Sequence, residues 1–157
     1  MSSPAVASPE LAVDLCRGAR ERAAHFAVRR AVFVEEQAMF EGDDRDERDL
    51  DVATLHALGR AGGRAAGAVR LYPIGGDEWK GDRLAVLREA RHGSLGARLV
   101  RFAVATAGAR GGARMVAMIQ LPNVAFFETL GWHADGGVVA FHGRPHRPMA
   151  IGLSPDA

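Results

Sequence analysis

The sequence has a single cysteine, Cys16, and no hydrophobic run that approaches the about 20 residues of a membrane-spanning helix. One cysteine excludes an internal disulfide, and no other potential ligands stand at the close spacing of a structural zinc site. The net charge of +1 does not favour general binding to nucleic acids or membranes. The N-terminus lacks the basic and apolar segments of a signal peptide. We therefore expect a cytoplasmic protein that binds no metal, nucleic acid or membrane.

The chain is long enough for one domain with a substantial core, since it has 157 residues, of which 48% are hydrophobic. It contains no internal repeat and no linker long enough to separate two domains. Residues 1–10, rich in Ser, Pro and Ala, are expected to form a flexible tail, and residues 11–157 a single domain. Cys16 stands among apolar residues and is expected to be a buried strand residue.

Strands and helices are predicted in the order β-α-β-β-β-α-β-α-β-β. Strands are expected at residues 11–17, 53–60, 65–72, 81–87, 114–119, 138–142 and 149–153, and helices at residues 19–36, 95–109 and 122–130. In the first helix, Ala24, Ala27, Ala31 and Val34 share one face. Residues 41–51 are too polar for a core element. This order predicts an α/β fold with a mixed central sheet of about six or seven strands flanked by helices.

The segment Arg91-His92-Gly93-Ser94-Leu95-Gly96-Ala97 predicts an anion site. It joins an expected strand to an expected helix, and the first backbone N–H groups of a helix are unpaired. These donors and the positive end of the helix dipole attract anions. Four arginines surround the turn: Arg88, Arg91, Arg98 and Arg101. The pattern indicates a ligand that carries phosphates, with an ordinary strand-to-helix turn as the alternative.

The order of the elements and two motifs resemble those of the GNAT-superfamily N-acetyltransferases. The resemblance covers about residues 11–153. The family's pyrophosphate signature, Arg/Gln-x-x-Gly-x-Gly/Ala, is similar to the segment from Arg91 to Gly96, with Ser94 where the first glycine is usual. Residues 126–132, Phe-Phe-Glu-Thr-Leu-Gly-Trp, resemble the family's Phe-Tyr-Glu-x-Leu-Gly-Phe segment. Residues 30–37 and 143–149, with His56 and the acidic stretch, resemble the ElaA-like branch.

The resemblance implies transfer of an acetyl group from acetyl-CoA to a primary amine of a small molecule or peptide, directly in a ternary complex. The strand before the turn would pair its backbone with the pantetheine arm. The cofactor-binding residues so implied are Leu84, Ala85, Val86, Arg91, Ser94, Leu95, Gly96, Ala97, Asn123 and Phe127. Gln120 is the alternative to Asn123 for contacting the CoA arm, and Asn123 is equally suited to cap a helix. The resemblance also allows a homodimer.

Direct transfer requires a base for the amine and a proton for the CoA thiolate. The family often uses a tyrosine in the short last helix as the acid, but this chain has Phe127 there, and its only tyrosine is Tyr72 on a different strand. Either water protonates the thiolate or catalysis has been lost or altered. The plain interpretation of Phe127 is core packing.

Four residues are candidates for the catalytic base: Glu35, Glu36, Asp49 and His56. Glu35 and Glu36 are expected where the first helix meets the acceptor-side loop, and histidine suits proton transfer near neutral pH. The structural alternatives are a solvated helix end for the two glutamates and a half-buried strand histidine for His56.

Two other functions remain open from the sequence. Ser94 and Phe127 are compatible with a non-catalytic acyl-CoA-binding or sensing module. Residues 30–33, the acidic stretch and residues 68–71 resemble acyl-homoserine-lactone synthases, although no tryptophan follows shortly after Phe33. The acidic stretch itself suggests a cationic acceptor, or else a solvated surface.

Overall fold

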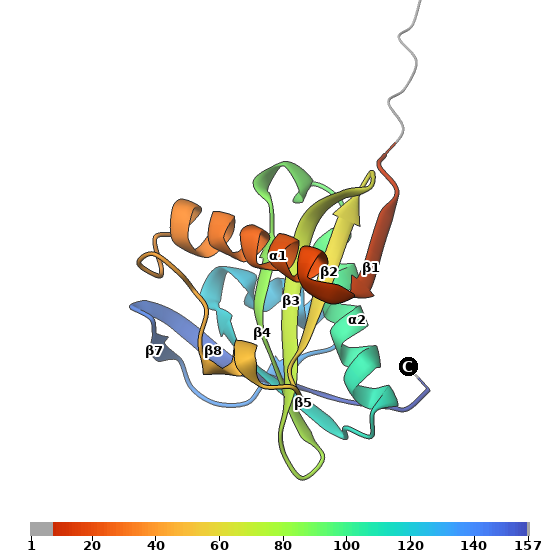
Figure 1. The fold of residues 1–157 in the computed structure, drawn as a ribbon. Helices are drawn as coiled ribbons and strands as arrows, with labels where there is room; N and C mark the ends of the chain where they lie inside the picture. The colour runs from red at the N-terminus through yellow and green to blue at the C-terminus, as the bar shows by residue number, and fades with distance from the viewer. Residues whose placement is uncertain (1–7, 157) are drawn as a thin grey trace, which may run out of the picture.

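The computed structural model describes residues 8–156, which form one eight-stranded sheet with helices on both faces (Figure 1). The strands follow the order β1-β2-β3-β4-β5-β8-β6, and β7 also pairs with β8. They are β1 (Leu11–Leu15), β2 (Leu55–Ala61), β3 (Arg64–Gly75), β4 (Glu78–Val86), β5 (Arg114–Gln120), β6 (His133–Ala134), β7 (Val139–Phe141) and β8 (Arg144–Gly152). The predicted α/β class and mixed sheet are confirmed. Most of the tail predicted at residues 1–10 lies outside the described residues.

The two central strands β4 and β5 are parallel, whereas the other neighbouring strands pair antiparallel. Their pairing covers only Glu78–Lys80 and Arg114–Val116. Beyond this point β4 continues beside β3, and β5 continues beside β8. Arg83 lies at an irregularity in the β3–β4 register and has a φ of 53°, as expected where a bulge bends a strand. The two strands therefore separate toward their carboxyl ends.

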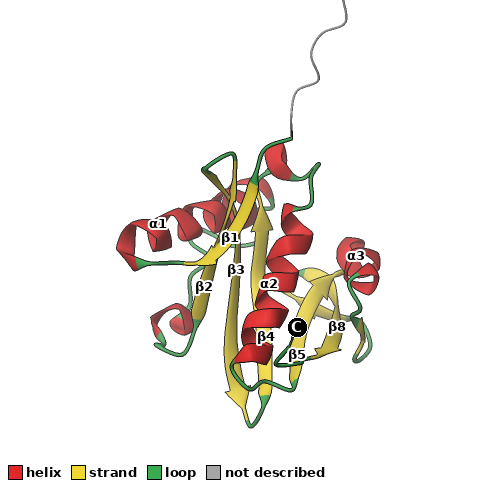
Figure 2. Ribbon diagram, turned by 90° about the vertical axis from the view of Figure 1, so that its right-hand side faces the viewer, coloured by secondary structure: helices red, strands yellow, loops and turns green. Residues whose placement is uncertain are grey.

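The two long helices cover opposite faces of the sheet (Figure 2). Helix α1 (Gly18–Arg29) continues as a π-helical segment, η1 (Arg30–Glu36), and helix α2 (Leu95–Ala109) has the predicted bounds. Helix α2 buries a stripe at i, i+4 spacing, formed by Leu95, Leu99, Ala103 and Ala107. Gly67 on β3 allows this close packing, because a Cβ there would lie 2.6 Å from Leu99 Cδ1.

The buried face of the first helix differs from the predicted alanine face. Ala27 is exposed, and the buried positions are His25, Val28, Arg29, Val32 and Phe33. The prediction was wrong because it excluded charged residues from the core. Arg29 is fully buried by pairing with carboxylates from the segment 41–51.

Three other expectations change. Asp44 and Asp49 are 1% and 4% exposed, so the segment 41–51, with η2 (Glu47–Leu50), contributes to the interior. Cys16 follows β1 and is half-buried rather than a buried strand residue. The expected loop at residues 73–78 is a tight turn between longer strands, made by Gly75 and Gly76 at positive φ.

Short elements complete the fold. These are η3 (Arg88–Ala90) before α2, η4 (Leu121–Asn123), and helix α3 (Val124–Thr129). The two-residue strand β6 was not predicted, and β8 is longer than expected because it begins at Arg144. Within residues 8–156, no helix has the length and apolar character needed to cross a membrane.

Candidate active site

The N-terminus of α2 presents unpaired backbone donors. The first hydrogen bond of the helix runs from Arg98 N–H to the Ser94 carbonyl, at 3.0 Å. The N–H groups of Leu95, Gly96 and Ala97 have no acceptor among residues 8–156, and the Ser94 side chain makes no capping bond. Three free donors at the positive end of a 15-residue helix form a site suited to an anion.

Ser94 fits this turn without strain. Its φ is −98°, so the backbone does not enter the left-handed region that would require glycine. The departure from the family signature therefore leaves the course of the turn intact. Gly96 lies close to both β4 and α3, because a Cβ there would lie 3.7 Å from Val86 Cγ2 and from Phe126 Cζ.

Arg91 is held beside the turn by two partners. Its Nε donates to the Val86 carbonyl at 2.9 Å, and its two terminal nitrogens donate to the Glu36 carboxylate at 2.6 and 2.5 Å. Arg88, which is largely exposed, lies 3.4 Å from the same carboxylate. Hydrogen bonds from Arg91, and then its charge and that of Arg88, lower the pKa of Glu36 to about 2. Glu36 is therefore an ionised anchor for the two arginines.

A cleft opens where β4 and β5 separate, with about 880 Å³ of empty space including its open mouth. It reaches both faces of the sheet: Phe33 belongs to the apolar cluster beneath α1, and Val100 to the cluster beneath α2. Of the residues implied by the resemblance, Leu84, Asn123 and Phe127 line this cleft. Ala85 and Val86 continue β4 toward the turn that precedes α2.

The two residues expected in the short last helix have different environments. Phe127 is 5% exposed and packs edge-on against Trp132, with ring centroids 5.3 Å apart, so it belongs to the core as well as to the cleft wall. Asn123 is exposed and its side chain makes no capping bond. Gln120, the alternative to Asn123, also lines the cleft and donates to the Gln37 side chain at 3.1 Å.

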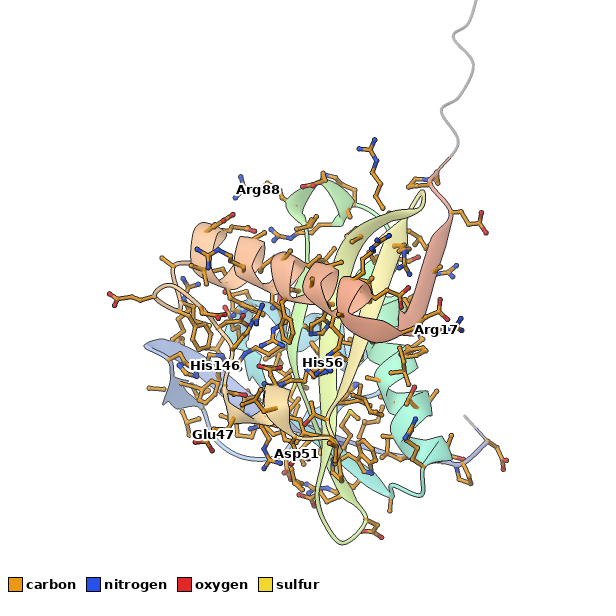
Figure 3. The ribbon with its side chains drawn as sticks, in the orientation of Figure 1. Arg17, Glu47, Asp51, His56, Arg88 and His146 are labelled. Carbon is orange, nitrogen blue, oxygen red and sulfur yellow. The ribbon has the colours of Figure 1, made fainter. Side chains whose placement is uncertain are left out.

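None of the four residues proposed from the sequence as the catalytic base lines the cleft. Glu35 is exposed, with Arg30 3.8 Å away. Glu36 is bound to Arg91 at the turn. His56 is buried, and its Nε2 donates to Asp49 Oδ1 at 2.9 Å. Figure 3 shows Arg88 on the other side of α1 from His56 and His146 in this view.

Five ionisable residues that line the cleft were missed: Lys80, Asp82, Arg83, His142 and His146. Burial, together with the charge of Arg83, lowers the pKa of His142, so that its imidazole is neutral at pH 7. The His142 ring contacts the Phe40 ring at a tilt of 48°, with the ring centroids 4.4 Å apart. The alternation of Lys80 and Asp82 along one strand is the signal that places both on the same face.

Three arginines and four aspartates form an ionic network behind the cleft, in which only Asp46 is exposed, at 41%. Arg29 pairs with Asp44 and Asp49, each at 2.8 Å. Arg70 pairs with Asp46 at 2.5 Å, Asp82 at 2.7 Å and Asp49 at 3.2 Å, and Arg83 pairs with Asp44 and Asp46. The network joins α1, the segment 41–51, β3 and β4, and it reaches the cleft at Asp82 and Arg83.

The network fixes the protonation states of its members. Burial would raise the pKa of Asp49, but hydrogen bonds from His56 and Arg29 outweigh burial and hold this pKa well below its usual range. Burial and the charge of Asp82 raise the pKa of Tyr72 to about 12, and the Tyr72 hydroxyl donates to Asp82 at 3.1 Å. Asp44, Asp46 and Asp49 are thus already paired with arginines, and they do not form the open acidic surface that the sequence suggested.

The separated central strands, the cleft between them and the free amides beside it are the features of a transferase that binds a nucleotide thioester. A sequence model described as the acetyltransferase (GNAT) family matches residues 19–132. The chain therefore belongs to this family, as predicted, and is an acyl-CoA-dependent acyltransferase.

Solved structures share the fold at low sequence identity. A Lactobacillus plantarum protein provisionally described as an N-acetyltransferase has a TM-score of 0.82 and 24% identity, over 91% of this chain and 98% of that one. ElaA of Escherichia coli has a TM-score of 0.78 and 22% identity, over 90% and 98% of the two chains. BjaI, a CoA-dependent acyl-homoserine lactone synthase solved with SAM and isopentyl-CoA, has a TM-score of 0.72 and 20% identity, over 85% and 76%.

Proposed function

We propose that the protein transfers an acetyl group from acetyl-CoA to a primary amine of a small molecule or peptide, directly in a ternary complex. The observation that carries this proposal is the run of three unpaired amides at the start of α2, beside the cleft between β4 and β5. Family membership supports the use of an acyl-CoA donor.

The donor would lie along β4 and across the turn. Its diphosphate would accept from the N–H groups of Leu95, Gly96 and Ala97, with Arg88 and Arg91 as the nearby cations. Its pantetheine arm would pair with the free edge of β4 at residues 84–86, where β5 has already separated. Asn123 and Phe127 would contact the arm from the opposite wall.

Trp132 gives this placement independent support. It lines the cleft, it is 5% exposed, and its buried Nε1 has no hydrogen-bond partner within the described part of the chain. A buried donor without a partner is unfavourable, because its lost hydration is not replaced. A carbonyl oxygen of the pantetheine arm is an acceptor of the kind that this group requires.

The reaction needs one proton acceptor and one proton donor. The amine nitrogen attacks the thioester carbonyl carbon, a C–N bond forms, the C–S bond breaks, and the amine loses a proton. The CoA thiolate leaves and takes up a proton from water, since no tyrosine lines the cleft within residues 8–156. A thiol with an ordinary pKa of about 8.5 is a good enough leaving group for this route.

We assign the proton-accepting role to His142 because it lines the cleft as a neutral imidazole. His56, which Asp49 holds inside the network, becomes a positioning residue for the acceptor side of the cleft. Glu36 anchors the donor-side arginines, and Glu35 lies outside both regions.

The test is release of CoA thiol when the purified protein is mixed with acetyl-CoA and a panel of amines, including alkyl diamines, amino-acid amides and peptides. We expect release with at least one amine and an acetylated product by mass spectrometry. H142Q should lower kcat with little change in KM for acetyl-CoA. Tight binding of acetyl-CoA without thiol release from any amine would instead support an acyl-CoA sensor.

The fold shared with BjaI supports one further candidate, a lactone synthase that uses S-adenosylmethionine as acceptor. The same assay with S-adenosylmethionine in place of the amine distinguishes the two. A lactone product would replace the amine-acetylation proposal.

A further inference from the structure

The cleft does not end at the plane of the sheet. Val69, Val100, Ala103 and Met115 line it, and all four belong to the apolar cluster beneath α2. These side chains are almost fully buried, with exposed fractions between 1% and 4%. An apolar chamber therefore extends from the point where β4 and β5 separate into the core under α2.

The two ends of the cleft differ in chemistry. Lys80, Asp82, Arg83 and His142 line the polar end and suit an amine acceptor. The end under α2 is lined by aliphatic side chains and a thioether, which offer no strong hydrogen-bond partner. Its occupant must therefore be apolar, and the apolar terminus of an acyl-CoA is the acyl chain.

The space available also exceeds what an acetyl group requires. The cleft as a whole, which includes the chamber, has a volume of about 120 Å³. A lined apolar cavity of roughly 150 Å³ holds a molecule of the size of benzene. A single methyl group would leave much of this space empty, and unfilled space loses the dispersion contacts of its walls.

We infer that the donor site binds acyl chains of about three to five carbons, straight or branched, in addition to acetyl, with the chain in the chamber under α2. This inference rests on the proposed function, and it extends the donor range of the same site. Amine attack, C–S cleavage and thiol release are the same for each of these donors.

Binding by calorimetry tests the inference without an acceptor. The ligands are CoA, acetyl-CoA, butyryl-CoA, isovaleryl-CoA and octanoyl-CoA. Each buried methylene should tighten binding by about fourfold, so butyryl-CoA should bind roughly tenfold or more tightly than acetyl-CoA. Octanoyl-CoA should gain nothing further, because a cleft of about 120 Å³ has no room for the additional methylenes. Equal affinities for acetyl-CoA and butyryl-CoA would overturn the inference, whereas failure of every thioester to bind would overturn the proposed function instead.

Two substitutions move the preference in opposite directions. A103L fills the chamber and should remove the advantage of butyryl-CoA over acetyl-CoA. V100A enlarges the chamber and should shift the best chain length upward by one or two carbons. A109L, on the exposed face of the same helix, is the control and should leave the ratio of the two dissociation constants unchanged.

Melting temperatures establish that each variant is folded. If A103L does not fold, the comparison of V100A with the unsubstituted protein still decides the question. A folded A103L, or a folded V100A, with an unchanged ratio of dissociation constants would show that the acyl chain lies elsewhere.

Discussion

Arg29 and Asp49 face each other across the interface between α1 and η2, with two parallel hydrogen bonds of 2.8 and 3.0 Å. Arg29 is fully buried and Asp49 is 4% exposed. A buried guanidinium and carboxylate tolerate this environment only while each has its partner. This pair therefore holds the segment 41–51 against the sheet, and with it the polar end of the cleft.

R29A should destabilise the protein by about 3–5 kcal/mol, because Asp44 and Asp49 would remain buried without their cation. Unfolding in urea measures the difference. R20A, an exposed arginine of the same helix, is the matched control and should change the free energy of unfolding by no more than about 0.5 kcal/mol. Similar values for the two variants would show that the network contributes little.

Stability should fall as the pH is lowered below about 6.5, and His25 is the cause. His25 is fully buried: its Nδ1 donates to the Ala57 carbonyl at 2.8 Å, and its Nε2 accepts from Arg29. Burial lowers the pKa of His25 from 6.5 to about 3. Between pH 6.5 and about 3, the unfolded chain therefore binds a proton at His25 that the folded chain does not. This difference lowers the free energy of unfolding by up to about 1.4 kcal/mol per pH unit.

Urea unfolding at several pH values between about 7 and 5 measures this slope, above the range in which the carboxylates titrate. H25Q retains a hydrogen-bonding side chain without a titrating group, and its stability should vary less with pH. An equal slope in both proteins would assign the effect to another group.

G96E should abolish binding of acetyl-CoA while the fold is retained. A Cβ at Gly96 makes only ordinary contacts at 3.7 Å, but the carboxylate would place bulk and negative charge where the diphosphate is proposed to bind. Calorimetry measures the affinity. G152E is the control: it adds the same charge at the last residue of β8, opposite Arg114, where a Cβ meets nothing within 4 Å. This variant should bind acetyl-CoA normally. Unchanged affinity in G96E would show that the turn is not the anion site.

E36Q should tighten acetyl-CoA binding by about two- to fivefold, since a phosphate would no longer compete with the carboxylate for Arg91. Because the pKa of Glu36 is about 2, the effect should persist from neutral pH to about pH 5. The neighbouring exposed E35Q is the control and should have no effect. A large loss of kcat in E36Q would instead restore Glu36 as the base.

F127A should lower the free energy of unfolding by about 3–5 kcal/mol, as expected for a buried aromatic ring that packs on another. The adjacent F126A removes a ring that is 37% exposed and should cost no more than about 1 kcal/mol. Thermal and urea unfolding distinguish the two. A near-normal melting temperature with lost turnover in F127A would assign Phe127 to the chemistry rather than to the core.

Local signals in the sequence were sufficient for the part of the fold that carries the proposed donor site. The turn from Arg91 to Ala97 and the bounds of α2 could be predicted because apolar periodicity, glycine and helix-end chemistry act over a few residues. The order of the elements, together with the segments from Arg91 to Gly96 and from Phe126 to Trp132, likewise resembled the family.

The ionic network beside the proposed acceptor site could not be predicted in the same way. Asp44 and Asp49 are buried through partners 15 and 20 residues away, and Asp82 pairs with Arg70 on the neighbouring strand. A charged segment in isolation resembles solvated surface, and only tertiary contacts turn it inward. Arg70, a lone charge between Val69 and Leu71 in a strand, was the available sign of a buried ion pair.

Lys80 is the only lysine in the 157 residues, and it lines the cleft. Amine-directed reagents, which on most proteins modify many scattered side chains, have a single lysine to modify here. The extent of its labelling therefore reports directly on whether the cleft is filled. Labelling of Lys80 can thus measure whether a ligand fills the cleft, even when the acceptor is not known.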